Sequence, residues 1–343
     1  MQCLRRVKLA CAAALALVHL AAAPPAVAQG SATLDAVKAR GAVRCGVSTG
    51  FPGFAAPDSR GEWRGLDVDA CRAVAAAALG DAAKVQYVPL TAVQRLPALT
   101  SGEVDMLARN TTWSLGRATT QGVNFVVINY YDGTGLMVPR PSNVTRLEQL
   151  NGSTICIQPG TETGLAVQDA FRRRNARFTP LMIEQADQLA AAYFAGRCDA
   201  LASDQTQLAG FRSRAPNAAE HVILPELVSK EPLSVAVRYG DDRWANIVRW
   251  SVWALIEAEE LGLASGNVVA ARESQEPAVQ RFLGRTGDLG QGLGLDNAWA
   301  ARIVEQVGNY AESFERNVVP LGIARGPNRL WRDGGLLIAP PFR

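Results

Sequence analysis

The sequence has 343 residues, of which 35 are basic, 32 are acidic and 48% are hydrophobic. A chain of this length can form two domains of ordinary size. Removal of the N-terminal export segment described next would take away three basic residues and no acidic ones, which leaves a net charge close to zero. Without a basic excess, the composition gives no electrostatic basis for binding nucleic acid or an anionic membrane.

Residues 1–28 have the pattern of a secretory signal peptide. A basic segment at residues 5–8 precedes an apolar run at residues 9–23, and the small residues 26–28 suit a cleavage site. A membrane anchor is the alternative, but this run is shorter than the roughly 20 apolar residues that a spanning helix needs. The sequence therefore predicts export, with cleavage after residue 28.

Two of the six cysteines, Cys3 and Cys11, would leave with the signal peptide, and four would remain: Cys45, Cys71, Cys156 and Cys198. An even number of cysteines in an oxidising compartment predicts two disulfides. Three connectivities are possible. Pairing neighbours in the sequence would hold each half of the chain together, whereas cross pairs would restrict motion between the halves. Four free thiols are the alternative. A zinc site is disfavoured because no two cysteines lie two to four residues apart and His221 is the only remaining histidine.

The mature chain alternates short β-branched runs with longer Ala- and Leu-rich stretches, a pattern typical of an α/β fold. The runs predict strands at residues 42–48, 84–90, 104–110, 153–158, 198–204 and 233–239. The clearest helix is expected at residues 244–261. Its apolar stripe is formed by Trp244, Ile247, Val248, Val252, Leu255 and Ile256. Trp250 and Trp253 lie off the stripe, so this helix is expected to bury more than one face.

A faint internal repeat relates residues 101–112 to residues 195–206 at a constant offset of 94. The matching positions include Gly102 with Gly196, Asp105 with Asp199 and Leu107 with Leu201. Each copy follows a helix-like stretch, which favours two similar α/β lobes over coincidence. Ligands of open α/β sheets bind where strands end.

Polar residues follow the predicted strand in both copies of the repeat. Asn110, Thr111 and Thr112 end the first copy, and Ser203, Asp204 and Gln205 end the second. Arg117 follows shortly after the first copy. Thr161 and Thr163 lie in a loop that opens a predicted helix, a position that favours an anion.

These residues offer one cation and one anion to a ligand such as an L-amino acid. Arg117 can bind both oxygens of a carboxylate, with donors near Asn110, Thr112 and Thr163. Asp204 can accept hydrogen bonds from an ammonium group. Each residue also has a structural interpretation, as a solvated charge or a turn residue.

Two aromatic residues, Phe51 and Phe54, lie in a loop rich in Gly and Pro. They would either form an apolar wall for a ligand or pack into the core.

Two enzymatic functions are alternatives. The segment 46–50, GVSTG, matches a nucleophile elbow with Ser48 as the nucleophile, and Asp204 and His221 follow in hydrolase order. The motif requires a helix after the turn, whereas a loop is predicted there. A dehydratase or lyase on the same fold is the second alternative, with Glu162 as its acid or base.

Seven segments carry a resemblance to the amino-acid-binding proteins of polar amino acid ABC importers. They are residues 45–54, 63–75, 96–119, 129–138, 154–164, 196–205 and 334–343. The whole mature chain resembles the general L-amino acid-binding subgroup. The resemblance implies a type II periplasmic binding fold, with two α/β lobes joined by crossing strands near residues 131–138 and 232–237. Lobe 1 would comprise residues 29–134 and 235–343, and lobe 2 residues 135–234.

The resemblance also implies a function and a set of site residues. The protein would bind L-amino acids in the periplasm as a monomer, without cofactor or metal, and deliver them to the permease of an ABC importer. Arg117 would bind the ligand's carboxylate and Asp204 its ammonium group. The neighbouring positions would be Asn110, Thr112, Thr161 and Thr163, with Phe51 and Phe54 as aromatic walls.

Four positions depart from the pattern of the family: Arg109, Gln158, Glu162 and Ser203. Because such positions determine side-chain preference, the preferred amino acid cannot be predicted from the resemblance. The segment after Gly284 is longer than in compact relatives, and its only predicted role is packing on the first lobe.

Overall fold

The computed structural model describes residues 30–343. The predicted signal peptide, with Cys3 and Cys11, lies outside these residues. Within the described part, no helix has the length and apolar character required to cross a membrane. The following account concerns the compact unit formed by residues 32–343.

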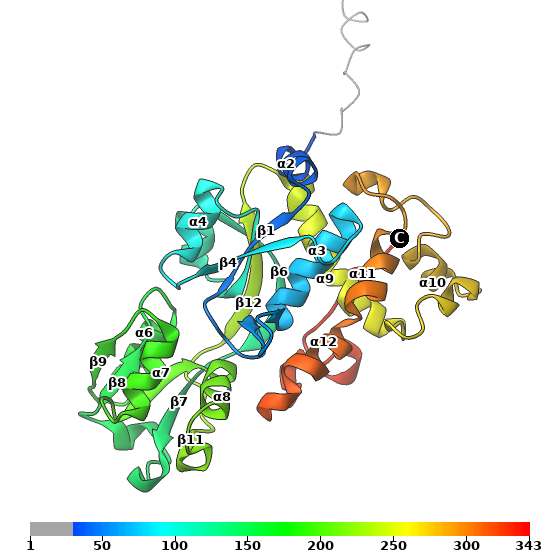
Figure 1. The fold of residues 1–343 in the computed structure, drawn as a ribbon. Helices are drawn as coiled ribbons and strands as arrows, with labels where there is room; N and C mark the ends of the chain where they lie inside the picture. Colours follow the sequence, from blue (N-terminus) through cyan, green and yellow to red (C-terminus); the bar gives the residue numbers. More distant parts are fainter. Residues whose placement is uncertain (1–29) are drawn as a thin grey trace, which may run out of the picture. The chain divides into compact units, whose positions relative to one another are not determined.

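Two five-stranded sheets organise this unit (Figure 1). The first sheet has the order β4 (Val85–Leu90), β1 (Val43–Ser48), β5 (Met106–Thr112), β12 (Glu231–Arg238), β6 (Val123–Asp132). The second has the order β11 (His221–Ile223), β7 (Thr134–Pro139), β10 (Ala200–Asp204), β8 (Thr154–Ile157), β9 (Thr179–Met182). A short hairpin, β2 (Ala56–Pro57) with β3 (Trp63–Arg64), completes the strands. We refer to the parts built on the two sheets as lobe 1 and lobe 2.

The two sheets have the same topology, which confirms the α/β class and the prediction of two similar lobes. In each, one central strand has a parallel neighbour on one side and an antiparallel neighbour on the other: β5 lies between β1 and β12, and β10 lies between β8 and β7. All six predicted strands are present, whereas β6, β7, β9 and β11 were not among them.

The chain passes between the lobes twice. It first crosses at Gly133, between β6 and β7, and it returns before Glu231, where β12 begins. Glu231 is paired with Asp132 in the ladder between β12 and β6. The exact lobe boundaries remain a prediction.

The internal repeat has a structural cause. Asp105 and Asp199 precede β5 and β10, and each carboxylate accepts a hydrogen bond from the backbone of the neighbouring strand. Asp105 accepts from Arg44 N at 2.7 Å, and Asp199 accepts from Thr154 N at 2.7 Å. The same residue thus fixes the start of the same strand pair in both lobes.

Helices cover the sheets and carry the connections. In lobe 1 they are α2 (Ala32–Arg40), α3 (Leu66–Leu79), α4 (Arg95–Ser101), α5 (Leu115–Thr120) and α9 (Asp242–Glu260). In lobe 2 they are α6 (Thr163–Arg173), α7 (Ala186–Phe194) and α8 (Gln205–Ser213). The predicted helix at residues 244–261 corresponds to α9, and every residue of its predicted stripe is buried.

The C-terminal segment packs against lobe 1. Its helices are α10 (Pro277–Phe282), α11 (Trp299–Val307) and α12 (Tyr310–Asn317), of which α11 and α12 lie beside α3 and α9 (Figure 1). The Phe342 ring contacts Trp250 of α9, with ring centroids 5.0 Å apart. Trp250 in turn contacts Trp253. This packing confirms that α9 buries more than one face.

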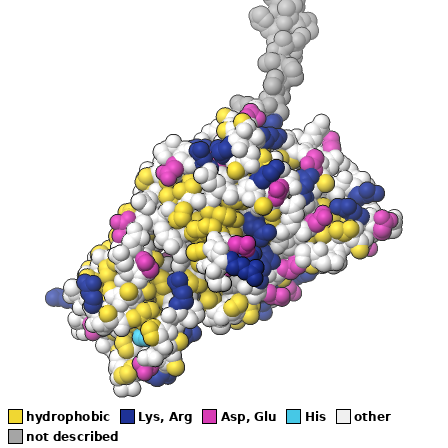
Figure 2. Space-filling view, in the orientation of Figure 1, with side chains coloured by type: hydrophobic (Ala, Val, Ile, Leu, Met, Phe, Trp, Pro, Cys, Tyr) yellow, Lys and Arg dark blue, Asp and Glu magenta, His cyan; other side chains and the backbone are white. Residues whose placement is uncertain are grey.

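Both disulfides join cysteines that are neighbours in the sequence, which is one of the three possible connectivities. Cys45 of β1 is bonded to Cys71 of α3, and Cys156 of β8 is bonded to Cys198, which precedes β10. Each bridge therefore lies within one lobe. On the face shown in Figure 2, basic and acidic side chains are interspersed, as expected for a chain of nearly balanced charge.

Candidate functional site

Arg117 of α5 is buried where the two lobes meet. Ser114 caps this helix and accepts a hydrogen bond from Arg117 N. The guanidinium donates to the carbonyl oxygens of Thr112 in lobe 1 and Gly160 in lobe 2, each at 3.1 Å. Its Nε lies 3.1 Å from a carboxylate oxygen of Glu162, which belongs to the same lobe 2 loop. The Arg117 guanidinium therefore contacts both lobes, as binding a shared ligand would require.

Two further buried arginines surround Arg117. Arg95, the first residue of α4, donates to Gly160 O at 3.0 Å. Arg109 of β5 donates to Leu90 O at 3.1 Å and to the side-chain oxygen of Asn110 at 3.0 Å. Burial lowers the pKa of Arg109 to about 10, and burial together with the charges of Arg109 and Arg117 lowers the pKa of Arg95. Arg95 was not among the predicted site residues.

Asp204 supplies the buried acid on the side of lobe 2. It lies at the end of β10, and the only hydrogen bond that its carboxylate accepts from the described residues comes from the side-chain amide of Asn110 at 3.4 Å. Burial, followed by the charges of Asp132 and Glu231, raises the pKa of Asp204 to about 8. A carboxyl group of this kind gains most from a cationic ligand, because a cation would stabilise its ionised form.

Asp132 and Glu231 place two more acids at the strand crossings. Glu231 accepts hydrogen bonds from the hydroxyl groups of Thr112 at 2.6 Å and Thr134 at 3.2 Å. Asp132 accepts from the backbone N–H of Thr206 at 3.2 Å. Neither acid was predicted. Asp132 is the last residue of β6 and Glu231 is the first residue of β12, and an acid at the terminus of a strand is not unusual.

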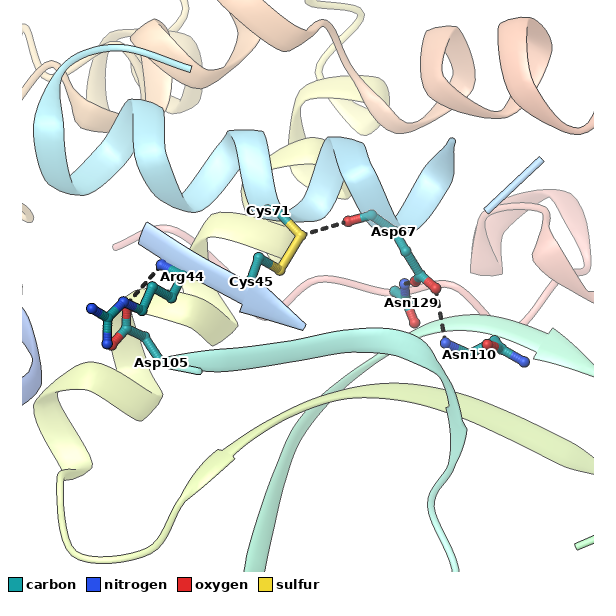
Figure 3. The surroundings of a disulfide bond; sticks show 7 residues. All are labelled: Arg44, Cys45, Asp67, Cys71, Asp105, Asn110 and Asn129. Atoms are coloured by element: carbon teal, nitrogen blue, oxygen red, sulfur yellow. Dashed lines mark hydrogen bonds between the residues drawn. A yellow bond between two sulfur atoms is a disulfide. The ribbon is translucent and has the colours of Figure 1, made fainter. Parts of the chain in front are cut away.

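Asn110 connects the basic and the acidic groups. Its φ of 36° lies in the left-handed region, which asparagine tolerates better than most residues. Its backbone N–H donates to Asp67 at 2.8 Å, and Asn129 donates to the other oxygen of the same carboxylate at 2.8 Å (Figure 3). Asp67 therefore holds the backbone of Asn110 in place, and the Asn110 side chain contacts both Arg109 and Asp204.

The other predicted site residues have different surroundings. Thr112 and Thr163 are buried near the lobe interface, and the Thr161 hydroxyl donates to Gln158 O at 2.7 Å. Phe51 and Phe54 are completely buried and stack with centroids 4.5 Å apart. Their burial in the core of lobe 1 agrees with the structural interpretation of these two rings.

The residues proposed for hydrolysis do not form a triad. Ser48 donates to Ala55 O at 3.2 Å and accepts from Phe51 N, so its hydroxyl group is engaged within a loop. His221 lies in lobe 2, with its Nδ1 3.1 Å from the Tyr193 hydroxyl. Among residues 30–343, no group of three or more His, Cys, Asp or Glu side chains could hold a metal ion.

The arrangement can bind a zwitterion. Buried guanidinium groups and buried carboxyl groups occupy one lobe interface, and both lobes contribute to it. A groove of about 760 Å³ opens beside the interface and is lined by Leu90, Val93 and Gln94 of lobe 1 and by Glu184 of lobe 2.

Comparison with known proteins decides the family. The profile of bacterial extracellular solute-binding proteins, family 3, matches residues 43–264. The chain belongs to this family. The match spans both sheets and all the polar residues of the lobe interface, which assigns the type II periplasmic binding fold expected from the sequence.

Several known proteins are similar to this chain over most of its length and of their own. The general L-amino acid-binding periplasmic protein AapJ of Rhizobium johnstonii is 50% identical over 92% of this chain and 94% of its own. The glutamate/glutamine/aspartate/asparagine-binding protein BztA of Rhodobacter capsulatus is 48% identical over 92% and 95%. An ABC transporter periplasmic binding protein from Brucella ovis, solved with glutathione bound, has a TM-score of 0.89 and 48% identity, and covers 92% of this chain and 100% of its own. These relatives are binding proteins and not enzymes, which disfavours the dehydratase and hydrolase alternatives.

Proposed function

We propose that this protein binds L-amino acids in the periplasm and delivers them to the membrane permease of an ABC importer. The observation that carries the proposal is that one buried interface contains both a cation, Arg117 of lobe 1, and an acid, Asp204 of lobe 2. An α-carboxylate needs a cation and an α-ammonium needs an anion, because burying either charge uncompensated costs several kcal/mol. The interface supplies both.

The mechanism that fits this geometry is capture by closure of the lobes. Arg117 binds the α-carboxylate, with help from the donors at Thr112 and Thr163, and Asp204 accepts from the ammonium group. A ligand that contacts both lobes stabilises the closed form by the difference between its affinities for the closed and open forms. The permease then recognises the closed form.

Location and assembly follow from the same proposal. The signal peptide predicted at residues 1–28 and the periplasmic relatives support a periplasmic location. One copy of the chain carries every residue of the site, so we propose that the protein acts as a monomer. Broad specificity is supported by the name of the relative from Rhizobium johnstonii.

Calorimetric titration of the mature protein, stripped of ligand by unfolding and refolding, tests the proposal. The proteinogenic L-amino acids and glutathione are titrated singly, with a small sugar as a control that lacks both charges. We expect saturable binding of several amino acids and none of the sugar. Folded protein that binds no amino acid would contradict the proposal.

A further inference from the structure

The lobe interface contains buried arginines that no carboxylate of the described residues is hydrogen-bonded to. Arg95, Arg109 and Arg117 are all buried there, and the exposed fractions of Arg95 and Arg109 are 2% and 1%. Arg117 has a carboxylate partner in Glu162. Within residues 30–343, neither Arg95 nor Arg109 is hydrogen-bonded to a carboxylate. Two buried guanidinium groups therefore lack a hydrogen-bonded anionic partner, which a second acidic group of a ligand could supply.

Arg95 is the less satisfied of the two. Arg109 donates through two of its nitrogens, to Leu90 O and to Asn110. Arg95 donates through one terminal nitrogen to Gly160 O, and its Nε has no hydrogen-bond partner among the described residues. An unsatisfied donor on a buried charged group is costly, because the group has lost its contact with water without gaining another partner. A group on the ligand that reached Arg95 would remove this cost.

The positions of the arginines fit one ligand with two acidic groups. Arg95 and Arg117 donate to the same oxygen, Gly160 O, at 3.0 and 3.1 Å, so their guanidinium groups are neighbours. Arg95 also follows Gln94 directly, and Gln94 lines the groove beside the interface. A side chain that extends from an α-carboxylate on Arg117 would therefore have Arg95 within reach.

We propose that Arg95, with Arg109 beside it, forms a subsite for a second carboxylate at the distal end of the ligand. Under this assignment the preferred ligands are L-amino acids with an acidic side chain, and small amino acids bind without using the subsite. The inference rests on the proposed function, because it assumes that the α-carboxylate occupies Arg117. It adds a determinant of specificity that amino acid binding alone does not require.

The test compares two ligands that differ only at the distal group. L-Glutamate and L-norvaline have side chains of similar length, but only glutamate ends in a carboxylate. In calorimetric titrations of the unaltered mature protein, we expect glutamate to bind about 10- to 100-fold more tightly, as for a hydrogen bond to a charged group. Equal affinities would overturn the subsite while leaving the proposed function intact. Failure of both ligands and of every other amino acid would contradict the proposed function itself.

A substitution assigns the preference to Arg95. In Arg95→Gln, the affinity for glutamate should fall by about 10- to 100-fold, whereas the affinity for norvaline should change little. The retained binding of norvaline also shows that the variant is folded. Equal losses for both ligands would mean that Arg95 acts only through its contact with Gly160 and would overturn the inference. Arg172→Gln, at an exposed arginine of α6, is the matched control and should leave both affinities unchanged.

Discussion

At the scale of single residues, the lobe interface is defined by buried charges that lack full compensation. Asp204 has one long hydrogen bond from the Asn110 amide, and the side chain of Arg117 pairs with Glu162 across the interface. Both residues are less than a tenth exposed. Charged groups in this situation are strongly stabilised by a partner of opposite charge, so a substitution of either residue should change ligand affinity measurably.

Removing either charge should weaken amino acid binding. In Arg117→Ala or Asp204→Ala, the affinity should fall by about 2 to 5 kcal/mol, because one charge of the ligand is left buried without its partner. Calorimetric titration with a single amino acid measures the loss. Arg172→Ala serves as the control, since its side chain is exposed. Near-normal affinity in both site variants would place the ligand elsewhere.

Protonation of Asp204 should couple ligand binding to pH. With the lobes in contact, burial followed by the charges of Asp132 and Glu231 raises the pKa of Asp204 to about 8, which favours the protonated form of this carboxyl group at neutral pH when no cation is bound. An ammonium group favours the ionised form, so binding should release a proton below about pH 8, and affinity should increase as the pH rises toward this value. Titrations in buffers of different ionisation enthalpy measure the proton release. In Asp204→Asn the release should disappear, and its persistence would contradict the assignment.

The same pKa shift affects stability in the opposite direction. The folded protein binds more protons than the unfolded chain between the ordinary pKa of an aspartate, about 3.9, and the raised value of about 8. The contribution of Asp204 to the free energy of unfolding is therefore present at low pH and is lost as the pH rises through this window.

The sequence predicted Arg117 and Asp204 with their neighbours Asn110 and Thr112, but not the further buried charges Arg95, Asp132 and Glu231. Arg117 and Asp204 follow strands within or next to the internal repeat, so local position was enough to select them. Arg95 and Glu231 come from segments distant in the sequence, and their proximity depends on how the chain crosses between the lobes. No local pattern distinguishes a buried arginine at the start of a helix from an exposed one.

At the scale of elements, the repeat determines which residues meet. Asn110 and Asp204 occupy equivalent positions at an offset of 94, each near the end of the central strand of its sheet, and they contact each other across the interface. The six predicted strands carry strong β-branched patterns. Two unpredicted strands, β9 and β11, are only four and three residues long, but length is not the whole reason, because β6 has ten residues and was also unpredicted.

The bridge between Cys45 and Cys71 should stabilise lobe 1. It joins β1 to α3, the helix that carries Asp67 (Figure 3). Replacing both cysteines with alanine should lower the free energy of unfolding by about 3 to 4 kcal/mol, as measured by urea denaturation. A reducing agent should have no effect once Cys156 and Cys198 are replaced as well. Unchanged stability of the double variant would show that the bridge does not constrain the unfolded chain.

At the scale of the whole molecule, the lobes approach each other closely at Gly160. This residue follows β8 of lobe 2, and a Cβ atom there would lie 3.0 Å from backbone atoms of Ala92 in lobe 1. Its φ of 75° is also in the left-handed region. Because Gly160 and Ala92 belong to different lobes, a side chain at position 160 would oppose the closure of the lobes.

Gly160→Ala should therefore weaken binding through the closed state. We expect a loss of about 1 to 3 kcal/mol in amino acid affinity, the usual cost of overpacking. Gly152→Ala is the matched control: it has a similar φ of 83° in the same lobe but no atom within 4 Å of the added Cβ. Both variants should lose similar stability in urea, and only Gly160→Ala should lose affinity. Equal affinities would indicate that the lobes need not approach this closely to hold ligand.

A crystal structure of the mature protein with an L-amino acid bound tests the central claim most directly. We expect the α-carboxylate to be hydrogen-bonded to the guanidinium of Arg117 and the ammonium group to the carboxylate of Asp204, with both lobes in contact with the ligand. A ligand bound elsewhere would contradict the account. One such place is the groove of about 780 Å³ lined by Phe171, Phe178 and Met182 of lobe 2.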